Sequence, residues 1–405
     1  MKKVTFIHAA DLHLDSPMVG LMNLPQKIFS RLQDSTFDAL KTVVDNALIH
    51  QVDFVIIAGD LFDGENRSIR AQIKFRKEME RLAEKNIPIY VVHGNHDHLD
   101  GNWTHLNMPN NVHVFSHEVE ALRFVKDEVS VHLYGFSYPR RHVYDRMISH
   151  YKKKQGADFH IGILHGHLEG NNEHDKYAPF SLKDLLHKDF DYWALGHIHK
   201  RQTLHTYPPV IYSGNIQGRN RKETGWKGCY LVQLTETEAE LQFIETSAVL
   251  WEEVNVDVSK ASSFQVIYDI CKSLIQEIRL ENKGIIVSMT LDFVNLPEQD
   301  MKSITEGDLL DALQEDEGEE EAFVWISSLT INEKIDWNRE HLAKESEFYA
   351  ELFMTAEQYD VLDSSISTLY NHPDARRLLK QISEEEKREI AKEAERLLVN
   401  LLYKH

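Results

Sequence analysis

Residues 91–97 have the sequence VVHGNHD, a short apolar run that ends in a cluster of metal-binding and proton-carrying side chains. Four other short apolar segments lead in the same way to polar clusters: DLH at 11–13, GDLFD at 59–63, HGH at 165–167 and GHIH at 196–199. Strands that are apolar on both faces belong inside a sheet, and the ligands of such sheets bind beyond the carboxyl ends of the strands. The five segments therefore predict strand ends that deliver Asp, His and Asn to one edge of a sheet, as in a metal site.

The chemistry of these clusters favours hard divalent cations. The clusters contain carboxylate, amide and imidazole groups, whereas the two cysteines, Cys229 and Cys271, lie elsewhere in the chain. Carboxylate, carbonyl and imidazole ligands suit Mn²⁺ or Mg²⁺, while thiolates select zinc or iron–sulfur clusters. Two cations about 3.5–4 Å apart need a bridging ligand such as a carboxylate, and the pair can clamp the attacking and leaving oxygens of a phosphoryl group. We therefore expect two divalent metal ions.

The order of the predicted elements indicates the fold. Strands and helices alternate up to residue 92, with helices over about 30–50 and 68–85, which predicts βαβ units with right-handed crossovers. Shorter alternating strands then predict a second sheet, and a basic helical stretch is expected over 140–154. We expect an α/β protein, a four-layer α-β-β-α sandwich of two mixed sheets with a small α+β cap and C-terminal helices. The predicted domains are the sandwich at 1–250, a β-α-β-α-β cap at 251–335 and a helical partner-binding region at 336–405.

The net charge of −20 comes from the C-terminal part of the chain. Residues 1–230 contain 29 Lys and Arg against 27 Asp and Glu, whereas residues 231–405 contain 16 against 38. Two bound divalent cations would make the first part positive. Nucleic acid is therefore a candidate ligand of the first part and is not expected on the second.

The sequence also indicates the compartment. No apolar run approaches the roughly 20 residues of a membrane span, and His8 and Asp11 interrupt the N-terminal apolar stretch too early for a signal peptide. Two cysteines without a CxxC motif are expected to be buried free thiols in a reducing compartment. We expect a cytoplasmic protein without a membrane partner.

In this order the motifs D-x-H, G-D-x-x-D, G-N-H-D, H and G-H-x-H resemble those of the calcineurin-like metallophosphoesterase superfamily, over about residues 1–230. Within it, the segments IHAADLHLD at 7–15, AGDLFD at 58–63 and HGNHD at 93–97 resemble the bacterial SbcD-type DNA-repair nucleases, and their YhaO branch in particular. The resemblance implies a Mn²⁺-dependent nuclease, with Mg²⁺ or another divalent ion as the alternative metal. It also implies an SbcC-like coiled-coil ATPase as partner of the C-terminal helices.

The resemblance further assigns roles within the site. It implies metal ligands at seven positions: Asp11, His13 and His199 on the first cation, Asp60 as the bridge, and Asn95, His165 and His197 on the second. His96 would face the scissile phosphate, where it stabilises charge or protonates the leaving oxygen, and Asp97 would orient it. His165 is favoured over His167 because it follows its strand directly. Asp63 is expected to be a hydrogen-bonding support, at a position where some relatives have a DNA-positioning His.

Three functions compete. The first is a nuclease acting on DNA ends or single strands, and the second is a small-molecule phosphoesterase for cyclic nucleotides or phosphomonoesters. The third is a non-enzymatic scaffold, which predicts eroded ligands although all seven positions are intact. The sequence does not decide between exonuclease and endonuclease action, and it leaves homodimer formation open.

The last helix has an apolar stripe, which the sequence predicts to pack in a core rather than to dock on a partner. The stripe consists of Ile390, Ala394, Leu397, Leu398, Leu401 and Leu402.

Overall fold

The computed structural model describes residues 2–18, 24–64, 67–101, 104–170, 177–315, 317, 322–333, 338–356 and 383–403. The chain divides into two compact units. The first comprises Met1–Val256, Ser263–Leu291 and Pro297–Thr330, and the second comprises Asp257–Ser262, Asp292–Leu296 and Ile331–His405. The predicted domain boundaries at 250 and 335 stay predictions. Among the helices of the described ranges, none is long and apolar enough to cross a bilayer.

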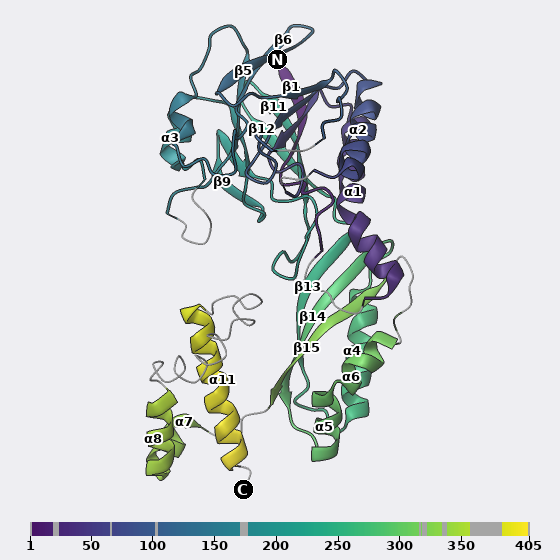
Figure 1. Cartoon of the computed structure of the whole chain (residues 1–405), viewed down its shortest axis with the longest axis vertical. Coiled ribbons are helices and arrows are strands. Elements are labelled where there is room, and N and C mark those ends of the chain that lie inside the picture. Colours follow the sequence, from purple (N-terminus) through teal and green to yellow (C-terminus); the bar gives the residue numbers. More distant parts are fainter. Residues whose placement is uncertain are drawn as a thin grey trace. The chain divides into compact units, whose positions relative to one another are not determined.

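Two six-stranded mixed sheets form the larger part of the first unit (Figure 1). The first sheet has the order β12 (Ala239–Glu245), β11 (Gly228–Thr235), β1 (Lys3–Ala9), β2 (Phe54–Ala58), β3 (Ile89–Val92) and β4 (Val112–Val114). The second has the order β5 (Glu120–Lys126), β6 (Val129–Gly135), β7 (Phe159–His165), β8 (Tyr192–Gly196), β10 (Pro209–Tyr212) and β9 (Gln202–Thr206). Strands β1, β2 and β3 are parallel neighbours, as are β6, β7 and β8.

Helices cover the outer faces of both sheets, which confirms the predicted four-layer sandwich. Helices α1 (Gln26–Ile49) and α2 (Ile69–Ala83) pack on the first sheet through residues such as Val44 and Phe75. The two sheets share an apolar layer that includes Phe54 and Ile161. A third layer, which includes Leu185 and Trp193, lies between the second sheet and the short helices α3 (Leu182–Leu186) and η1 (Met147–His150). This burial on both faces explains why strands β2, β3 and β8 are apolar throughout and why β7 is apolar apart from His160 and His165.

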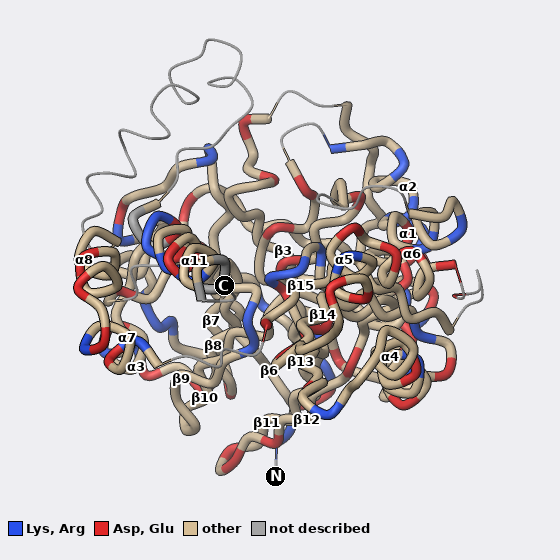
Figure 2. The backbone as a smooth tube through the Cα atoms, turned by 90° about the horizontal axis from the view of Figure 1, so that it is seen from below, with Lys and Arg blue, Asp and Glu red and all other residues tan. Residues whose placement is uncertain are grey.

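A third sheet of three strands forms the predicted α+β cap. Its order is β13 (Val249–Asp257), β14 (Gly284–Val294) and β15 (Val324–Glu333). Ile28 and Leu32 of α1 pack in one apolar cluster with Trp251 and Ile286 of this sheet. The cap also contains α4 (Phe264–Ile278), α5 (Glu298–Glu306) and α6 (Asp308–Glu315), and Gly307, with a φ of 104°, separates α5 from α6. Helix α6 has acidic residues and neither Lys nor Arg (Figure 2).

The C-terminal helices of the second unit share a small apolar cluster. Helices α7 (Arg339–Glu345), α8 (Glu347–Ala356) and α11 (Glu384–Tyr403) contribute Leu342, Phe353 and Val399 to it. The sequence predicted core packing for the stripe of the last helix, but Ile390, Ala394, Leu397, Leu398 and Leu402 are exposed, and the side chain of Leu401 lies outside the described residues. Val399, the residue that α11 contributes to the apolar cluster, is not part of that stripe. The helix therefore packs in the cluster through a different face.

The basic helical stretch predicted over 140–154 is wrong. Only the single 3₁₀ turn of η1 is helical there. The carbonyl of Val143 accepts a hydrogen bond from the backbone N–H of Ala178, 2.6 Å away, instead of bonding within a helix. Val143 is itself buried in the apolar layer beneath the second sheet. Outside η1 the segment is therefore irregular and bonds to a distant residue, which local helical spacing could not indicate.

Candidate metal centre

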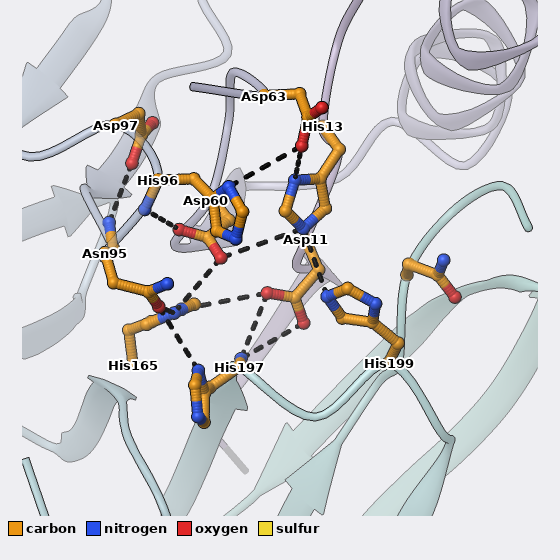
Figure 3. Close-up of polar contacts among 12 residues, drawn as sticks. Asp11, His13, Asp60, Asp63, Asn95, His96, Asp97, His165, His197 and His199 are labelled. Carbon is orange, nitrogen blue, oxygen red and sulfur yellow. Dashed lines mark hydrogen bonds and ion pairs between the residues drawn. The ribbon is translucent and has the colours of Figure 1, made fainter. Parts of the chain in front are cut away.

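The five predicted clusters follow β1, β2, β3, β7 and β8 and come together at the carboxyl ends of these strands (Figure 3). Three of the strands belong to the first sheet and two to the second, so the clusters meet between two sheets rather than along one edge. The β1 and β2 ladder continues past the strands, because Asp11 N–H donates to Gly59 and His13 N–H donates to Asp60. This continuation holds the first two clusters side by side.

Asp11, His13, Asp60 and His199 form a first group of potential ligands. One ligand atom from each lies within 4.8 Å of all the others. Nε2 of His13 lies 3.1 Å from Nε2 of His199 and 3.7 Å from Oδ2 of Asp60. The carboxylate of Asp11 accepts hydrogen bonds from the backbone N–H of His197, at 3.0 and 3.1 Å. These are the residues that the sequence assigned to the first cation and to the bridge.

Hydrogen bonds direct lone pairs toward the middle of this group. Asp63 lies 2.9 Å from Nδ1 of His13, and Glu223 lies 2.8 Å from Nδ1 of His199. Because an ionised carboxylate only accepts, both Nδ1 atoms carry a proton, and in a neutral ring Nε2 then keeps the lone pair. Two lone pairs therefore face each other beside Asp60. Acceptors that converge without a donor fit a bound cation.

The charges of the supporting groups agree with this assignment. Burial disfavours ionisation of Asp63 and Glu223, but the hydrogen bonds from His13 and His199 hold the pKa of each carboxyl below its usual range. Burial, followed by the nearby guanidinium of Arg219, lowers the pKa of His13 to about 3. His13 is therefore a neutral imidazole near pH 7, which is the form that binds a metal.

Asn95, His165 and His197 form a second group next to Asp60. Oδ1 of Asn95 lies 3.0 Å from Nε2 of His165 and 3.2 Å from Nδ1 of His197. Nε2 of His165 also lies 3.4 Å from Oδ2 of Asp60. Nδ1 of His165 donates to the carbonyl of Ala58, so its Nε2 points at oxygen acceptors. Burial lowers the pKa of His165, but Asp60 outweighs burial and raises it to about 9. This position attracts a positive charge, either a proton or a cation.

The histidine pair after β7 is separated by the fold. His165 reaches Asn95 and Asp60, whereas the ring of His167 lies with its centre 6.4 Å from that of His197. Both rings are buried. The geometry brings His165 into the second group, as the sequence predicted, and the identity of the ligand stays a prediction.

The predicted partnership between His96 and Asp97 is wrong. The carboxylate of Asp97 accepts from Nδ1 of His93 at 2.8 Å, and from the N–H groups of Gly94 and Leu61, so it braces the loop. The imidazole of His96 faces Asp63 instead, with Nδ1 3.6 Å from Oδ1 (Figure 3). The motif placed Asp97 next to His96 in sequence, but consecutive side chains of this loop point in different directions.

Two further residues of the site carried no motif. Nη1 of Arg219 lies 2.7 Å from Asp63, and its Nη2 lies 3.4 Å from Glu223. We call Asp63, Arg219 and Glu223 the carboxylate–arginine bridge, because they connect Nδ1 of His13 to Nδ1 of His199. The sequence motifs pointed to neither Arg219 nor Glu223. An acid four residues after an arginine was the one available signal in the sequence.

The backbone is strained where it presents ligands. Asp11, His13, Asp60 and His197 have positive φ values of 51°, 43°, 47° and 99°. Such conformations are uncommon for residues other than glycine and are concentrated at functional sites. A Cβ on Gly94 would lie 2.3 Å from Oδ1 of Asp60 and 2.6 Å from Nε2 of His165. Glycine at this position thus lets the third cluster approach the other two.

Comparisons with known proteins agree with this geometry. A family model described as calcineurin-like phosphoesterase matches residues 4–201. The uncharacterized metallophosphoesterase YhaO of Bacillus subtilis is 42% identical over 400 residues, which cover 98% of this chain and 97% of that protein. The DNA double-strand break repair protein Mre11 of Thermoplasma acidophilum is 28% identical over 258 residues, which cover 59% of this chain and 65% of that protein. The SbcD component of the nuclease SbcCD of Bacillus subtilis is 25% identical over 256 residues, which cover 54% of this chain and 63% of that protein.

Proposed function

This chain belongs to the calcineurin-like metallophosphoesterase family, and we propose that it is a dimetal-dependent phosphodiesterase that cuts DNA, as exonuclease or endonuclease, in DNA repair. The observation that carries the proposal is the pair of adjacent ligand groups that share Asp60. A mononuclear site would need only one of the groups. Two adjacent groups around one carboxylate are the arrangement that two-metal phosphoesterases use.

The donor set fits two divalent cations, with Mn²⁺ the first choice. One ion would be held by Asp11, His13 and His199, and the other ion would be held by Asn95, His165 and His197. Asp60 would bind both ions. When bound, such a pair polarises a phosphoryl group and activates a water molecule for attack on phosphorus. All of these ligand atoms are oxygen or imidazole nitrogen, which suits Mn²⁺ or Mg²⁺ and gives zinc no thiolate.

His96 is the proton carrier of the proposed reaction. Its side chain is 34% exposed, whereas those of His13, Asp60 and His165 are almost fully buried. Exposure lets His96 meet a substrate. Two contacts fix the orientation of the His96 ring: one with Asp63, and one with the ring of His13, whose centre lies 4.8 Å away. An imidazole in this position can donate a proton to the leaving oxygen or stabilise charge on the phosphoryl group.

Two relatives support DNA as the substrate. The names of these relatives, Mre11 and the SbcD component of SbcCD, describe a DNA break repair protein and a part of a nuclease. They match 59% and 54% of this chain. The near-neutral charge of residues 1–230 permits a polyanion there, while the acidic helices of the cap do not favour one.

An SbcC-like coiled-coil ATPase is the proposed protein partner. The exposed apolar side chains of the second unit, Phe348 and Met354 on α8 and Leu397 and Leu398 on α11, offer a surface for helices. The name of the nuclease SbcCD, of which one relative is a component, also supports a partnered nuclease. This partner extends the proposal for the active site and does not depend on the identity of the metal.

The experiment compares DNA with a small diester. The full-length protein is incubated with Mn²⁺ and labelled single-stranded or duplex DNA, or with bis-p-nitrophenyl phosphate. We expect cleavage of both kinds of substrate, and a loss of roughly 100-fold or more in kcat for His96→Ala. His50→Ala, which removes an exposed histidine at the end of α1, is the matched control and should be unchanged. Hydrolysis of the small diester without DNA cleavage, even with the ATPase present, would favour the small-molecule phosphoesterase instead.

A further inference from the structure

Four aromatic rings lead from the surface to the candidate metal centre. The exposed ring of Tyr144 stacks on His142, with ring centres 5.9 Å apart and planes 6° from parallel. Both rings contact Tyr177, at 6.0 and 5.4 Å between centres, and Tyr177 contacts His197 at 5.6 Å. Tyr144 is therefore two ring contacts away from a residue of the second ligand group.

The chain around these rings explains why they share one face. Val143 is buried, and its carbonyl is bound to the N–H of Ala178. His142 and Tyr144, on either side of the buried Val143, are both exposed. His142 and Tyr144 are thus presented together, and Nδ1 of His142 lies 2.9 Å from the hydroxyl of Tyr177, which fixes the ring.

The two stacked rings are open to solvent and follow two arginines in the sequence. Tyr144 is 65% exposed although it is a large aromatic residue. Arg140 and Arg141, both exposed, precede the stacked pair in sequence. Exposed aromatic rings next to cations, beside a centre that hydrolyses phosphodiesters, are the combination by which proteins bind single-stranded nucleic acid.

We propose that Tyr144 and His142 form a stacking platform for an unpaired base of a single-stranded nucleic acid whose backbone enters the metal centre. The proposal rests on the proposed nuclease function and specifies its substrate. In a duplex both faces of an internal base are covered by its neighbours, so a ring can stack only on a single strand or a frayed end. The platform is also separated from the metal centre by Tyr177, so it would contact a nucleotide next to the one that reacts.

The test measures base-dependent affinity. Fluorescence anisotropy gives Kd for a labelled oligothymidine and for an abasic strand of equal length, in EDTA to prevent cleavage. Tyr144→Ala should raise Kd for oligothymidine roughly 5- to 150-fold and leave Kd for the abasic strand within about twofold. Tyr144→Phe keeps the ring and should restore the affinity. Tyr207→Ala, at a tyrosine that is 60% exposed in the β9–β10 turn, is the matched control and should bind like the wild type.

Two results would overturn the platform. Equal losses for oligothymidine and the abasic strand would show that Tyr144 acts on the backbone or on the fold, and thermal unfolding of each variant separates these two causes. Wild-type affinity of Tyr144→Ala for oligothymidine would also refute it. If the wild type binds and cuts single strands while Tyr144→Ala behaves identically, the platform alone fails. If the wild type hydrolyses only the small diester, the proposed nuclease function fails as well.

Discussion

Glu223→Gln tests whether the carboxylate–arginine bridge prepares the metal centre. The side chain of Glu223 is 11% exposed and accepts hydrogen bonds from Nδ1 of His199 at 2.8 Å, Nδ2 of Asn215 at 2.7 Å and the backbone N–H of Arg219 at 2.9 Å. Glutamine keeps the shape of the side chain but replaces one accepting oxygen with an NH₂ group. That NH₂ must face a donor, whichever way the amide is turned.

The magnitude follows from the tautomer of His199. When the amide turns its NH₂ toward His199, the imidazole keeps a lone pair on Nδ1 and carries its proton on Nε2, the atom that faces His13. When the amide turns the other way, Asn215 and Arg219 lose their acceptor. Loss of such a partner weakens metal binding by roughly 10- to 100-fold, or about 1.4–2.8 kcal/mol.

Isothermal titration calorimetry of the metal-free protein with Mn²⁺ measures this change. The matched control is Glu317→Gln, because the Glu317 side chain is also little exposed, at 5%, and is ion-paired with Arg279 at 2.8 Å, but lies in the cap. We expect the control to lower the unfolding temperature and leave the affinity for Mn²⁺ intact. A Glu223→Gln protein that is folded and binds Mn²⁺ within about twofold of the wild type would refute the reasoning.

Three further outcomes are expected. Gly94→Ala should abolish measurable Mn²⁺ binding in calorimetry, because the new methyl would overlap Asp60 and His165, and normal binding would contradict the close approach. Burial lowers the pKa of His8 to about 3 and that of His160 to about 4, below the unfolded value of about 6.5. Below pH 6.5 the unfolded chain therefore takes up more protons than the folded protein does. The unfolding temperature of the metal-free protein should fall as the pH is lowered from 7 to 5, and an unfolding temperature that does not change over this range would argue against the buried neutral histidines. EDTA should stop hydrolysis and lower the unfolding temperature, and added Mn²⁺ should restore both, whereas chelator-resistant hydrolysis would exclude a metal centre.

The fold could be predicted from the sequence because its signals are local. Strands β2, β3 and β8 are short and apolar throughout, and β7 is apolar apart from two histidines. Helices with a regular apolar face alternate with the first of these strands. Burial on both faces leaves such strands no other position than inside a covered sheet. The prediction of a helix over 140–154 was wrong because the contact that decides this segment is not local. The carbonyl of Val143 bonds to a residue 35 positions away.

The sequence by itself determined which side chains gather at the candidate centre. Asp, His and Asn follow strand ends, and chain connectivity fixes where strand ends lie, so Asp11, Asp60, Asn95, His165 and His197 could be named in advance. Only the tertiary structure decided which way these side chains face. It turned His96 toward Asp63 instead of Asp97, and it placed Glu223 behind His199. Orientation depends on hydrogen bonds between segments far apart in the chain, and a motif contains no information about the other segment.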